Sequence, residues 1–333
     1  MAASVPKLLV VGGNGFLGSA ICKAAVTKGW EVSSMSLSGK PYTTPAGHTP
    51  SWVGKVKWEN GDAFNSESYS NLMKDKTSII HTLGILLEDS GYKKSIKDGN
   101  YFGLINSLLK STNLPIPGSG SSSKQGNPLK TEEEKKFGYE GMNRDSALKV
   151  LDTFLSSTSN SSITINPPPL TPKQFIYISA ADAFRPLIPS RYIETKREAE
   201  LEIARRCESY NEKHITENQG QIKPIFIRPG LMYHPHIRPL TTLPAFFIDL
   251  SSKLSLKTGI SNPFASKSSL YGALESLKTF PLHVDHVANS ILKSIEDSRN
   301  NTTKQEEDYG WGGARIIEVD QMREWAGLGK KKL

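Results

Sequence analysis

Short apolar runs recur along the first 230 residues and alternate with stretches of helical periodicity. Residues 7–11 form an apolar run that ends at a glycine pair, and residues 16–28 then repeat apolar side chains at helical spacing. Short, continuous apolar runs are typical of strands buried on both faces of a parallel sheet. Further strands are expected at residues 31–37, 56–58, 78–83, 175–179 and 224–228. This alternation predicts an α/β fold with a doubly wound parallel sheet and right-handed crossovers.

A glycine-rich turn lies between the first strand and the first helix. Gly12, Gly15 and Gly18 have the spacing G-x-x-G-x-x-G. Glycines here permit a tight turn, close approach of the backbone to a pyrophosphate, and close packing of the helix on the sheet. The N-terminal end of the helix offers free N–H groups and a positive dipole end to the phosphates. The sequence predicts a dinucleotide site with contacts from Gly12, Asn14, Gly15, Phe16, Leu17 and Gly18. The alternative is an inherited turn that no longer binds.

The residues that follow the second strand bear on the choice of cofactor. An acid there would bind the 2′-hydroxyl of NAD, but the segment contains Ser36, Ser38 and Lys40 and no acid. Hydroxyls and a lysine can accommodate a 2′-phosphate, so NADP(H) is favoured. NAD(H) remains the alternative because the segment has no arginine. Further cofactor contacts are expected after the next strands, from Asp62, Thr82, Leu83 and Gly84. A simple turn cap explains Asp62 equally well.

Tyr192 and Lys196 lie four positions apart, which places them on one face of a helix. A nearby ammonium lowers the pKa of a phenol from about 10 toward neutrality. Tyr192 would then serve as a proton donor or acceptor. Ser179 ends the preceding predicted strand and could orient a substrate carbonyl. Taken alone, the pair is better explained as a surface tyrosine and a solvated lysine, but its combination with Ser179 and the glycine turn favours a catalytic set.

These motifs together resemble the short-chain dehydrogenase/reductase family, which implies a Rossmann-like fold and a nicotinamide cofactor. The residues at matching places are Gly12, Gly15, Gly18, Ser179, Tyr192 and Lys196. Residues 139–147 resemble that family's helix with a central asparagine, which implies that Asn143 completes the catalytic set. Residues 228–230 and 283–288 resemble segments of the extended and atypical branches. By this resemblance Tyr192, Lys196 and Pro229 also contact the cofactor.

Residues 12–18, 81–88 and 196–200 are similar to a fungal mitochondrial branch associated with coenzyme Q (ubiquinone) biosynthesis. That branch is related to the nucleotide-binding accessory subunit of respiratory complex I. The resemblance implies a location on the matrix side of the inner mitochondrial membrane. It also implies partners in the ubiquinone-synthesising complex and a prenylated quinone intermediate as a candidate ligand. Two functions stay open: an NADP-dependent reductase acting on a quinoid or carbonyl group, and a non-catalytic assembly or regulatory subunit.

The domain organisation follows from the change of pattern near residue 230. Residues 1–230 are predicted to form the dinucleotide-binding domain, with insertions near 111–136 and 156–172 that are rich in small polar residues. Residues 231–333 are predicted to form a smaller C-terminal lobe and tail, which ends with a strand and helix at 314–325. Apolar clusters at 243–277 indicate an amphipathic lid; the alternatives are a tunnel for a prenyl tail and a peripheral membrane contact.

Composition and charge exclude several other classes of protein. The net charge is +8, but the basic residues are scattered and do not interleave with aromatic side chains, so nucleic-acid binding is not expected. No apolar run is long enough to form a transmembrane helix. The two cysteines exclude a disulfide scaffold and suit a reducing compartment. No cleaved leader is expected, because the first strand begins at residue 7.

Three histidines are candidates for site chemistry: His81, His234 and His236. His234 and His236 lie two positions apart, but no third ligand is near them in the sequence, so no metal site is expected. His81 lies on an apolar strand and is expected to be a hydrogen-bonded core residue and not a catalyst.

Overall fold

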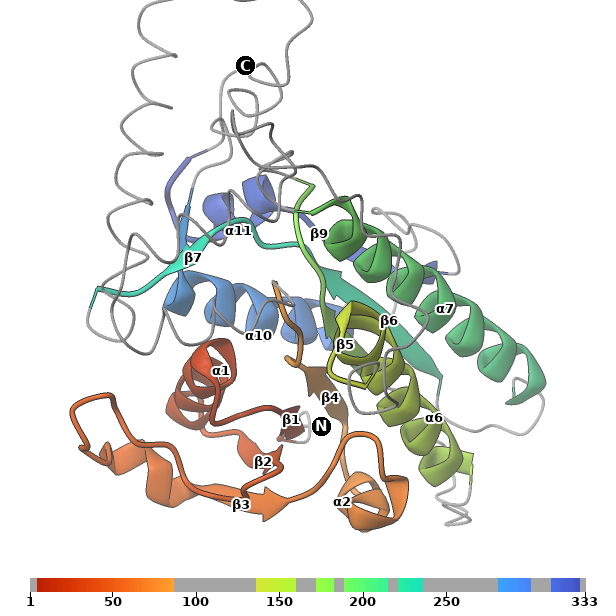
Figure 1. Cartoon of the computed structure of the whole chain (residues 1–333), viewed down its shortest axis with the longest axis horizontal. Helices are drawn as coiled ribbons and strands as arrows, with labels where there is room; N and C mark the ends of the chain where they lie inside the picture. Colours follow the sequence, from red (N-terminus) through yellow and green to blue (C-terminus); the bar gives the residue numbers. More distant parts are fainter. Residues whose placement is uncertain are drawn as a thin grey trace, which may run out of the picture.

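The computed structural model describes residues 5–86, 136–159, 172–182, 189–214, 221–235, 281–300 and 313–329. Within these segments the central sheet has seven parallel strands in the order β3-β2-β1-β4-β5-β6-β9 (Figure 1). They are β1 (Lys7–Val11), β2 (Glu31–Ser36), β3 (Val56–Asn60), β4 (Ser78–His81), β5 (Lys173–Ile178), β6 (Ile222–Ile227) and β9 (Arg315–Ile317). The strand order reverses between β1 and β4, and open α/β sheets bind ligands at such a point. The predicted doubly wound fold is confirmed.

The six strands predicted in the first 230 residues all form, with ends that differ by up to two residues. The last predicted strand becomes β9, and it pairs with β6 at the edge of the same sheet, with Phe226 opposite Ile316. Residues assigned to the C-terminal lobe therefore complete the main sheet. The predicted division near residue 230 stays a prediction.

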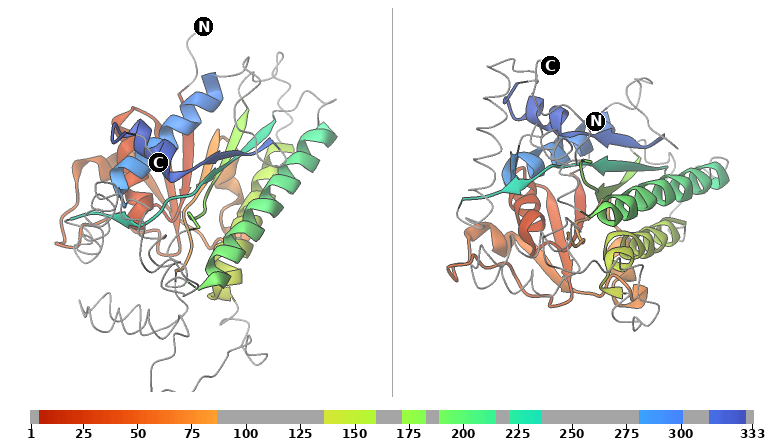
Figure 2. Two further views of the ribbon diagram at one scale, coloured as in Figure 1. Left: turned by 90° about the horizontal axis from the view of Figure 1, so that it is seen from above. Right: turned by 45° about the horizontal axis from the view of Figure 1, so that its top comes forward.

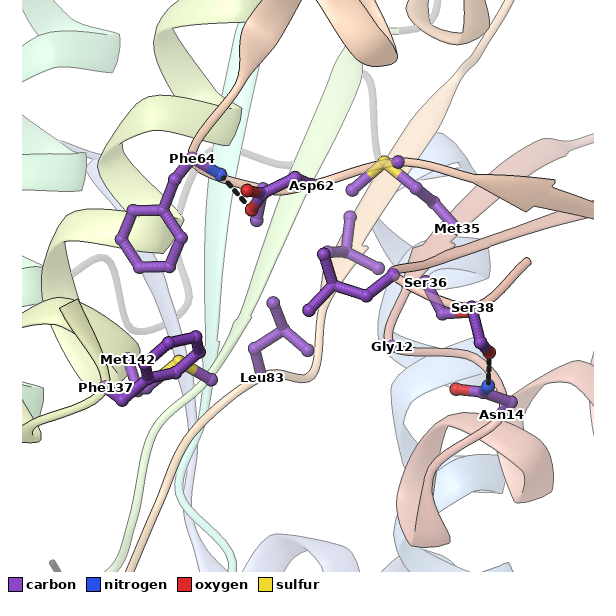
Figure 3. Close-up of a pocket in the computed structure, with 14 residues that line it drawn as sticks. Gly12, Asn14, Met35, Ser36, Ser38, Asp62, Phe64, Leu83, Phe137 and Met142 are labelled. Atoms are coloured by element: carbon purple, nitrogen blue, oxygen red, sulfur yellow. Dashed lines mark hydrogen bonds between the residues drawn. The ribbon is translucent and has the colours of Figure 1, made fainter. Parts of the chain in front are cut away.

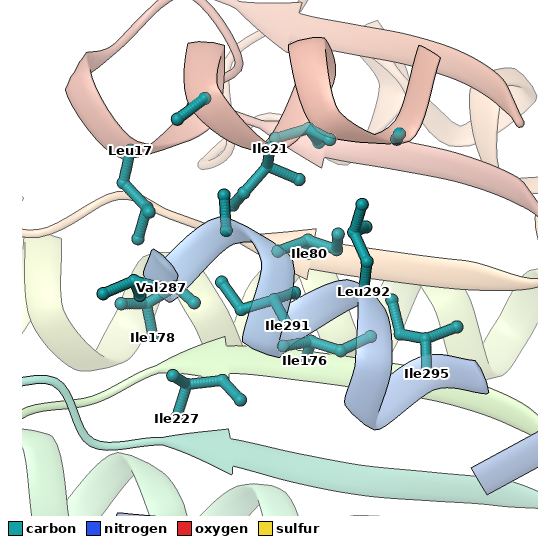
Figure 4. Close-up of a cluster of buried hydrophobic side chains, with 14 of the residues drawn as sticks. Leu17, Ile21, Ile80, Ile176, Ile178, Ile227, Val287, Ile291, Leu292 and Ile295 are labelled. Atoms are coloured by element: carbon teal, nitrogen blue, oxygen red, sulfur yellow. The ribbon is translucent and has the colours of Figure 1, made fainter. Parts of the chain in front are cut away.

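Helices cover both faces of the sheet. One face carries α1 (Phe16–Thr27) and α10 (Val284–Asn300), and the other carries α6 (Ser146–Ser159) and α7 (Ser190–His214) (Figures 1 and 2). Because side chains alternate along a strand, Leu8 and Val10 of β1 pack beneath α1 and α10, while Leu9 and Val11 pack on the opposite side. Figure 4 shows the first of these clusters, in which side chains of α1 and α10 interdigitate above the sheet.

Shorter elements connect the main ones. Four short helical elements precede α6: η1 (Ser51–Lys55), η2 (Ser66–Ser68), α2 (Ser70–Met73) and the π-helical η3 (Glu140–Asp145). Near the C-terminal end, β7 (Met232–Tyr233) and β8 (Leu282–His283) form a separate two-stranded parallel sheet that leads directly into α10. The helix α11 (Val319–Trp325) follows β9, as predicted.

The end of α6 differs from the sequence prediction. Residues 156–159 were assigned to a polar insertion, but they form the last turn of this helix. Their hydroxyl groups donate back to carbonyls of the preceding turn, for example from Ser156 Oγ to the Asp152 oxygen at 2.9 Å and from Thr158 Oγ1 to the Phe154 oxygen at 2.9 Å. Backbone-bonded hydroxyls therefore allow a serine-rich segment to continue the helix.

Several predicted features lie outside the described residues. These are most of the insertion at 111–136, residues 160–171 of the second insertion, and the apolar clusters at 243–277. Among the helices that are described, none combines the length and the hydropathy that crossing a bilayer requires.

Candidate active site

The glycine turn after β1 has the geometry that its sequence predicts. Gly12 has a φ of +86°, and its N–H donates to the Met35 oxygen of β2 at 2.8 Å. The Gly15 N–H donates to the Gly12 oxygen at 2.9 Å, which closes the turn. A Cβ atom on Gly18 would lie 2.2 Å from the Gly12 oxygen. Only glycine therefore fits at Gly18, and the first turn of α1 lies directly against the loop.

A pocket of about 290 Å³ opens beside this turn, above the ends of β1, β2 and β3 (Figure 3). It is lined by Val11, Gly12, Asn14, Met35, Ser36, Leu37, Ser38, Gly61, Asp62, Ala63, Phe64, Leu83, Phe137 and Met142. The structure thus brings together six of the predicted cofactor contacts: Gly12, Asn14, Ser36, Ser38, Asp62 and Leu83. Lys40 is exposed and does not line the pocket. Leu17 packs into the core between α1 and α10 (Figure 4).

The polar corner of the pocket joins the glycine turn to the end of β2. Asn14 Nδ2 donates to Ser38 Oγ at 3.2 Å, as Figure 3 shows. The hydroxyls of Ser36 and Ser38 lie 3.4 Å apart, and the Lys40 backbone N–H donates to Ser38 Oγ at 3.3 Å. This corner carries hydroxyl and amide groups and no carboxylate, so it offers nothing that repels a phosphate.

Phe137 lines the other end of the pocket, and Lys136 contacts the lining residues Asp62 and Phe64; the sequence predicted neither Lys136 nor Phe137 as part of the site. Lys136 Nζ donates to Asp62 Oδ2 at 2.9 Å and lies 4.7 Å from the centre of the Phe64 ring. Burial alone would raise the pKa of Asp62, but the hydrogen bonds from Lys136 and from the Phe64 N–H lower it below its usual value. The carboxylate is therefore held by a cation. Lys136 lies far from Asp62 in sequence, so no local pattern predicts their contact.

The end of β4 connects the pocket to the catalytic candidates. Thr82 Oγ1 donates to the Val11 oxygen at 2.8 Å, which holds the segment after β4 against the glycine turn. Two residues later, a Cβ atom on Gly84 would lie 2.9 Å from Lys196 Nζ and 3.0 Å from Asn143 Oδ1. The absence of a side chain at Gly84 lets these two polar groups reach the chain beside the pocket.

Lys196 is buried, with 3% of its surface exposed. Its Nζ donates to the Ile178 oxygen at the end of β5, at 2.9 Å, and lies 4.8 Å from the centre of the Tyr177 ring. Burial lowers the pKa of Lys196 to about 7, although the charge of Glu200 partly opposes this effect. A lysine with this pKa changes its charge near neutral pH.

Asn143 lies in the π-helical segment η3 and is fully buried. Its side chain makes two bonds to one residue: Oδ1 accepts from the Ile85 N–H at 2.9 Å, and Nδ2 donates to the Ile85 oxygen at 3.2 Å. Its backbone oxygen accepts a hydrogen bond from the Tyr177 hydroxyl. The extra residue in a π-helical turn re-aims side chains at functional sites. Here Asn143 joins the chain after β4 to η3.

Tyr192 and Pro229 are two further residues that were predicted to contact the cofactor. Tyr192 is half-buried on the first turn of α7, and its ring meets the Tyr139 ring edge-on with centroids 6.3 Å apart. It precedes Lys196 by one helical turn, so both residues lie on the predicted helix. The buried Pro229 accepts a hydrogen bond from the Ala181 N–H at 2.9 Å and thereby ties the segment after β6 to the segment after β5.

Ser179 is buried beneath Arg197, a residue to which the sequence assigned no role. Arg197 Nη1 donates to Ser179 Oγ at 2.9 Å and to Glu200 Oε1 at 2.7 Å. Glu200 in turn pairs through both carboxylate oxygens with Arg228. Ser179 therefore belongs to a charged network. The Arg197–Glu200 pair is the part of this network with a local signal, because the two residues lie three positions apart on α7.

His81 agrees with its predicted structural role. It is fully buried, and its Nε2 lies 3.1 Å from Ser146 Oγ. Burial and the charge of Lys196 lower the pKa of His81 to about 3, so the ring is neutral. Its ring stacks on Tyr177 with centroids 5.9 Å apart. His81 therefore supports the β4 side of the site.

This chain is similar to a known family and to known proteins. Residues 8–113 match the NAD dependent epimerase/dehydratase family. The chain is 36% identical to MIOREX complex component 2 of Saccharomyces cerevisiae over 293 residues, which span 88% of this chain and 94% of the yeast protein. An uncharacterized chloroplastic protein of Arabidopsis thaliana is 41% identical over 78 residues, 23% of this chain and 24% of that protein.

The solved structures extend this comparison to the fold. An oxidoreductase of the short-chain dehydrogenase/reductase family from Burkholderia thailandensis has a TM-score of 0.51 at 10% identity, and the match covers 98% of this chain and 99% of the other. That likeness concerns the fold alone. The 36% identity to the yeast protein extends over nearly the whole of both chains, so this chain belongs to the family of MIOREX complex component 2.

Proposed function

We propose that this protein binds NADP(H) and acts as a reductase or dehydrogenase on a quinoid or carbonyl group. One observation carries the proposal: Lys196 Nζ is buried beside Gly84 and Asn143, one helical turn after Tyr192. This arrangement lies next to a pocket whose glycine turn has no room for side chains.

The residues present fit a nicotinamide dinucleotide. The N–H groups that follow Gly12 and begin α1 can hold the pyrophosphate. The pocket bounded by Ser36, Ser38 and Phe137 can hold the adenosine part, and the chain at Gly84 lies where the nicotinamide ribose is expected. The name of the matching family includes NAD dependence, which supports a nicotinamide cofactor in general. The hydroxyl-lined corner without an acid supports NADP(H) over NAD(H).

The chain's own residues have distinct roles in this proposal. When bound, the cofactor supplies or accepts the hydride. Tyr192 exchanges a proton with the reacting oxygen of the substrate through its phenol group, and Lys196 lowers the pKa of that phenol when it is charged. Ser179 donates a hydrogen bond to the same oxygen. Asn143 acts as a positioning residue, because its side chain holds the chain after β4 in place.

The cellular role is proposed from the family. We infer that the protein works in mitochondria, at the matrix side of the inner membrane, in or with ubiquinone biosynthesis. Its partners would be proteins of the ubiquinone-synthesising complex, and its substrate would be a prenylated quinone intermediate. The yeast relative's name, which makes it a component of a multi-protein complex, supports a role within an assembly.

A non-catalytic role is the second candidate, and the state of Ser179 favours it. This residue is 3% exposed, and Arg197 already occupies its oxygen. In that case the bound nucleotide would stabilise the fold by mass action, and the protein would serve as an assembly or regulatory subunit.

Titration of the full chain with NADPH and NADH, followed by nicotinamide fluorescence, tests the proposal. We expect NADPH to bind more tightly than NADH. Tyr192→Phe should keep the affinity for NADPH, and it should abolish reduction of a short-chain quinone. Binding without turnover, with no change in Tyr192→Phe, would favour the non-catalytic role. No binding of either nucleotide would contradict both candidates.

A further inference from the structure

A group of metal-ligating side chains lies outside the nucleotide pocket, where the small sheet meets α10. His234 directly follows β7, His283 ends β8, and Asp285 lies in the first turn of α10. One nitrogen of each imidazole and one oxygen of the carboxylate all lie within 4.8 Å of one another. All three residues are half-buried. The sequence shows no third ligand near His234, because His283 and Asp285 lie far along the chain.

We propose that His234, His283 and Asp285 bind a divalent first-row transition metal of the Zn²⁺ type. Two imidazoles and one carboxylate are a ligand set that such ions use, with the remaining position open to water. A metal here would join β7, β8 and α10. The inference does not depend on the proposed oxidoreductase function.

His283 Nδ1 faces the Asp285 side of the cluster. It accepts a long hydrogen bond from the Asp285 backbone N–H at 3.2 Å, and a metal ion bound at this nitrogen would take the place of that N–H donor. The same nitrogen lies 4.0 Å from Asp285 Oδ2. Ligand atoms of a tetrahedral zinc ion are about 3.3 Å apart, so this pair needs to close by less than about 1 Å. The rings of His234 and His283 have centroids 4.8 Å apart, within reach of one ion.

A cation already lies beside the carboxylate of this cluster. Lys23 Nζ of α1 lies 3.4 Å from Asp285 Oδ2, and α1 packs against α10. A metal ion at the cluster therefore has to compete with the Lys23 ammonium for Asp285. Removal of this ammonium should strengthen metal binding, whereas an accidental surface histidine pair would not respond to it.

Calorimetric titration of the untagged full chain with Zn²⁺ tests the proposal, and Co²⁺ absorption reports the ligands. We expect one equivalent to bind, with affinity reduced at least about tenfold in His234→Gln, His283→Gln and Asp285→Asn. Lys23→Met should bind several times more tightly than the unaltered protein. The Co²⁺ spectrum should lack a thiolate band, because neither of the buried cysteines, Cys22 and Cys207, belongs to the clustered ligands.

His286→Gln is the matched control. Its ring lies near His283, with centroids 5.9 Å apart, but it is not one of the three clustered ligands. We expect this variant to retain the affinity of the unaltered protein. Absence of Zn²⁺ binding, or binding that His283→Gln and Lys23→Met leave unchanged, would overturn the proposal. Circular dichroism establishes that each variant is folded.

Discussion

Arg197 Nη1 donates a hydrogen bond to Ser179 Oγ at 2.9 Å, and its Nη2 donates to the Ala180 oxygen at 2.9 Å. The serine oxygen accepts from a cation, so its own O–H remains available to donate. A guanidinium that polarises the hydroxyl makes it a stronger donor toward a substrate oxygen. The same contact also covers the serine. The polarised hydroxyl suits the catalytic candidate function, and the covered serine suits the non-catalytic one.

Replacement of Arg197 should separate these roles. Arg197→Met removes charged hydrogen bonds to Ser179 and Glu200, and we expect it to lower the free energy of unfolding by about 1–3 kcal/mol. Glu200 keeps its pair with Arg228, which limits the loss. Arg205→Met on the same helix is the control: Arg205 is exposed, and its removal should have no measurable effect in urea denaturation. If Ser179 takes part in turnover, Arg197→Met should lower kcat and leave the affinity for NADPH unchanged.

The glycine turn should not tolerate a methyl group at Gly18. In Gly18→Ala the new Cβ would lie 2.2 Å from the Gly12 oxygen and 2.7 Å from the Gly13 Cα. We expect a loss of about 1–3 kcal/mol in stability from this overpacking, together with loss of nucleotide binding. Gly54→Ala is the control, since a Cβ there meets nothing within 4 Å. Equal NADPH affinity in both variants would contradict a phosphate site at this turn.

The cofactor preference should reverse when an acid is introduced after β2. Ser36→Asp places a carboxylate at the corner of the pocket that carries hydroxyls. A carboxylate repels a 2′-phosphate and accepts a hydrogen bond from a 2′-hydroxyl. We expect NADPH affinity to fall at least about tenfold, with NADH affinity unchanged or improved. Ser36→Ala controls for loss of the hydroxyl. An equal effect of the two variants on both nucleotides would place the 2′ position elsewhere.

Stability of the nucleotide-free protein should rise with pH because of Lys196. Its pKa falls from 10.5 to about 7 on folding, as a result of burial. Below pH 7 the amine is protonated in both states, so the cost of burying its charge is fully present. Between the two values the folded state loses its proton and the unfolded state keeps it, so the free energy of unfolding increases with pH.

Urea denaturation between pH 6.5 and about 9 measures this slope. Lys196→Met should reduce the slope by the contribution of one proton. Lys149→Met replaces an exposed lysine on α6, and it should leave the slope unchanged. A slope that is identical in Lys196→Met and in the unaltered protein would show that the buried amine keeps its proton throughout this range.

Periodicity and glycine spacing were sufficient to predict the strands of the main sheet and the glycine turn. Strands such as β1 and β5 are short apolar runs, and their burial on both faces leaves a clear signal. The Tyr192 and Lys196 pair was found because both lie on one helix, where local spacing fixes their relative positions. The serine-rich end of α6 was predicted wrongly because hydroxyl bonds to the backbone can continue a helix that composition alone would end.

Contacts between distant segments depended on the tertiary structure. Lys136 reaches Asp62, Arg197 covers Ser179, and Asp285 comes beside His234, and none of these relations leaves a local pattern. The burial that lowers the pKa of Lys196 arises from packing of α7 and η3 against the sheet. The sequence alone determined the individual strands and helices and the glycine turn, because backbone sterics and local periodicity act over a few residues. Only the tertiary structure decided which charged side chains are in contact, because folding brings together residues that are far apart in the chain.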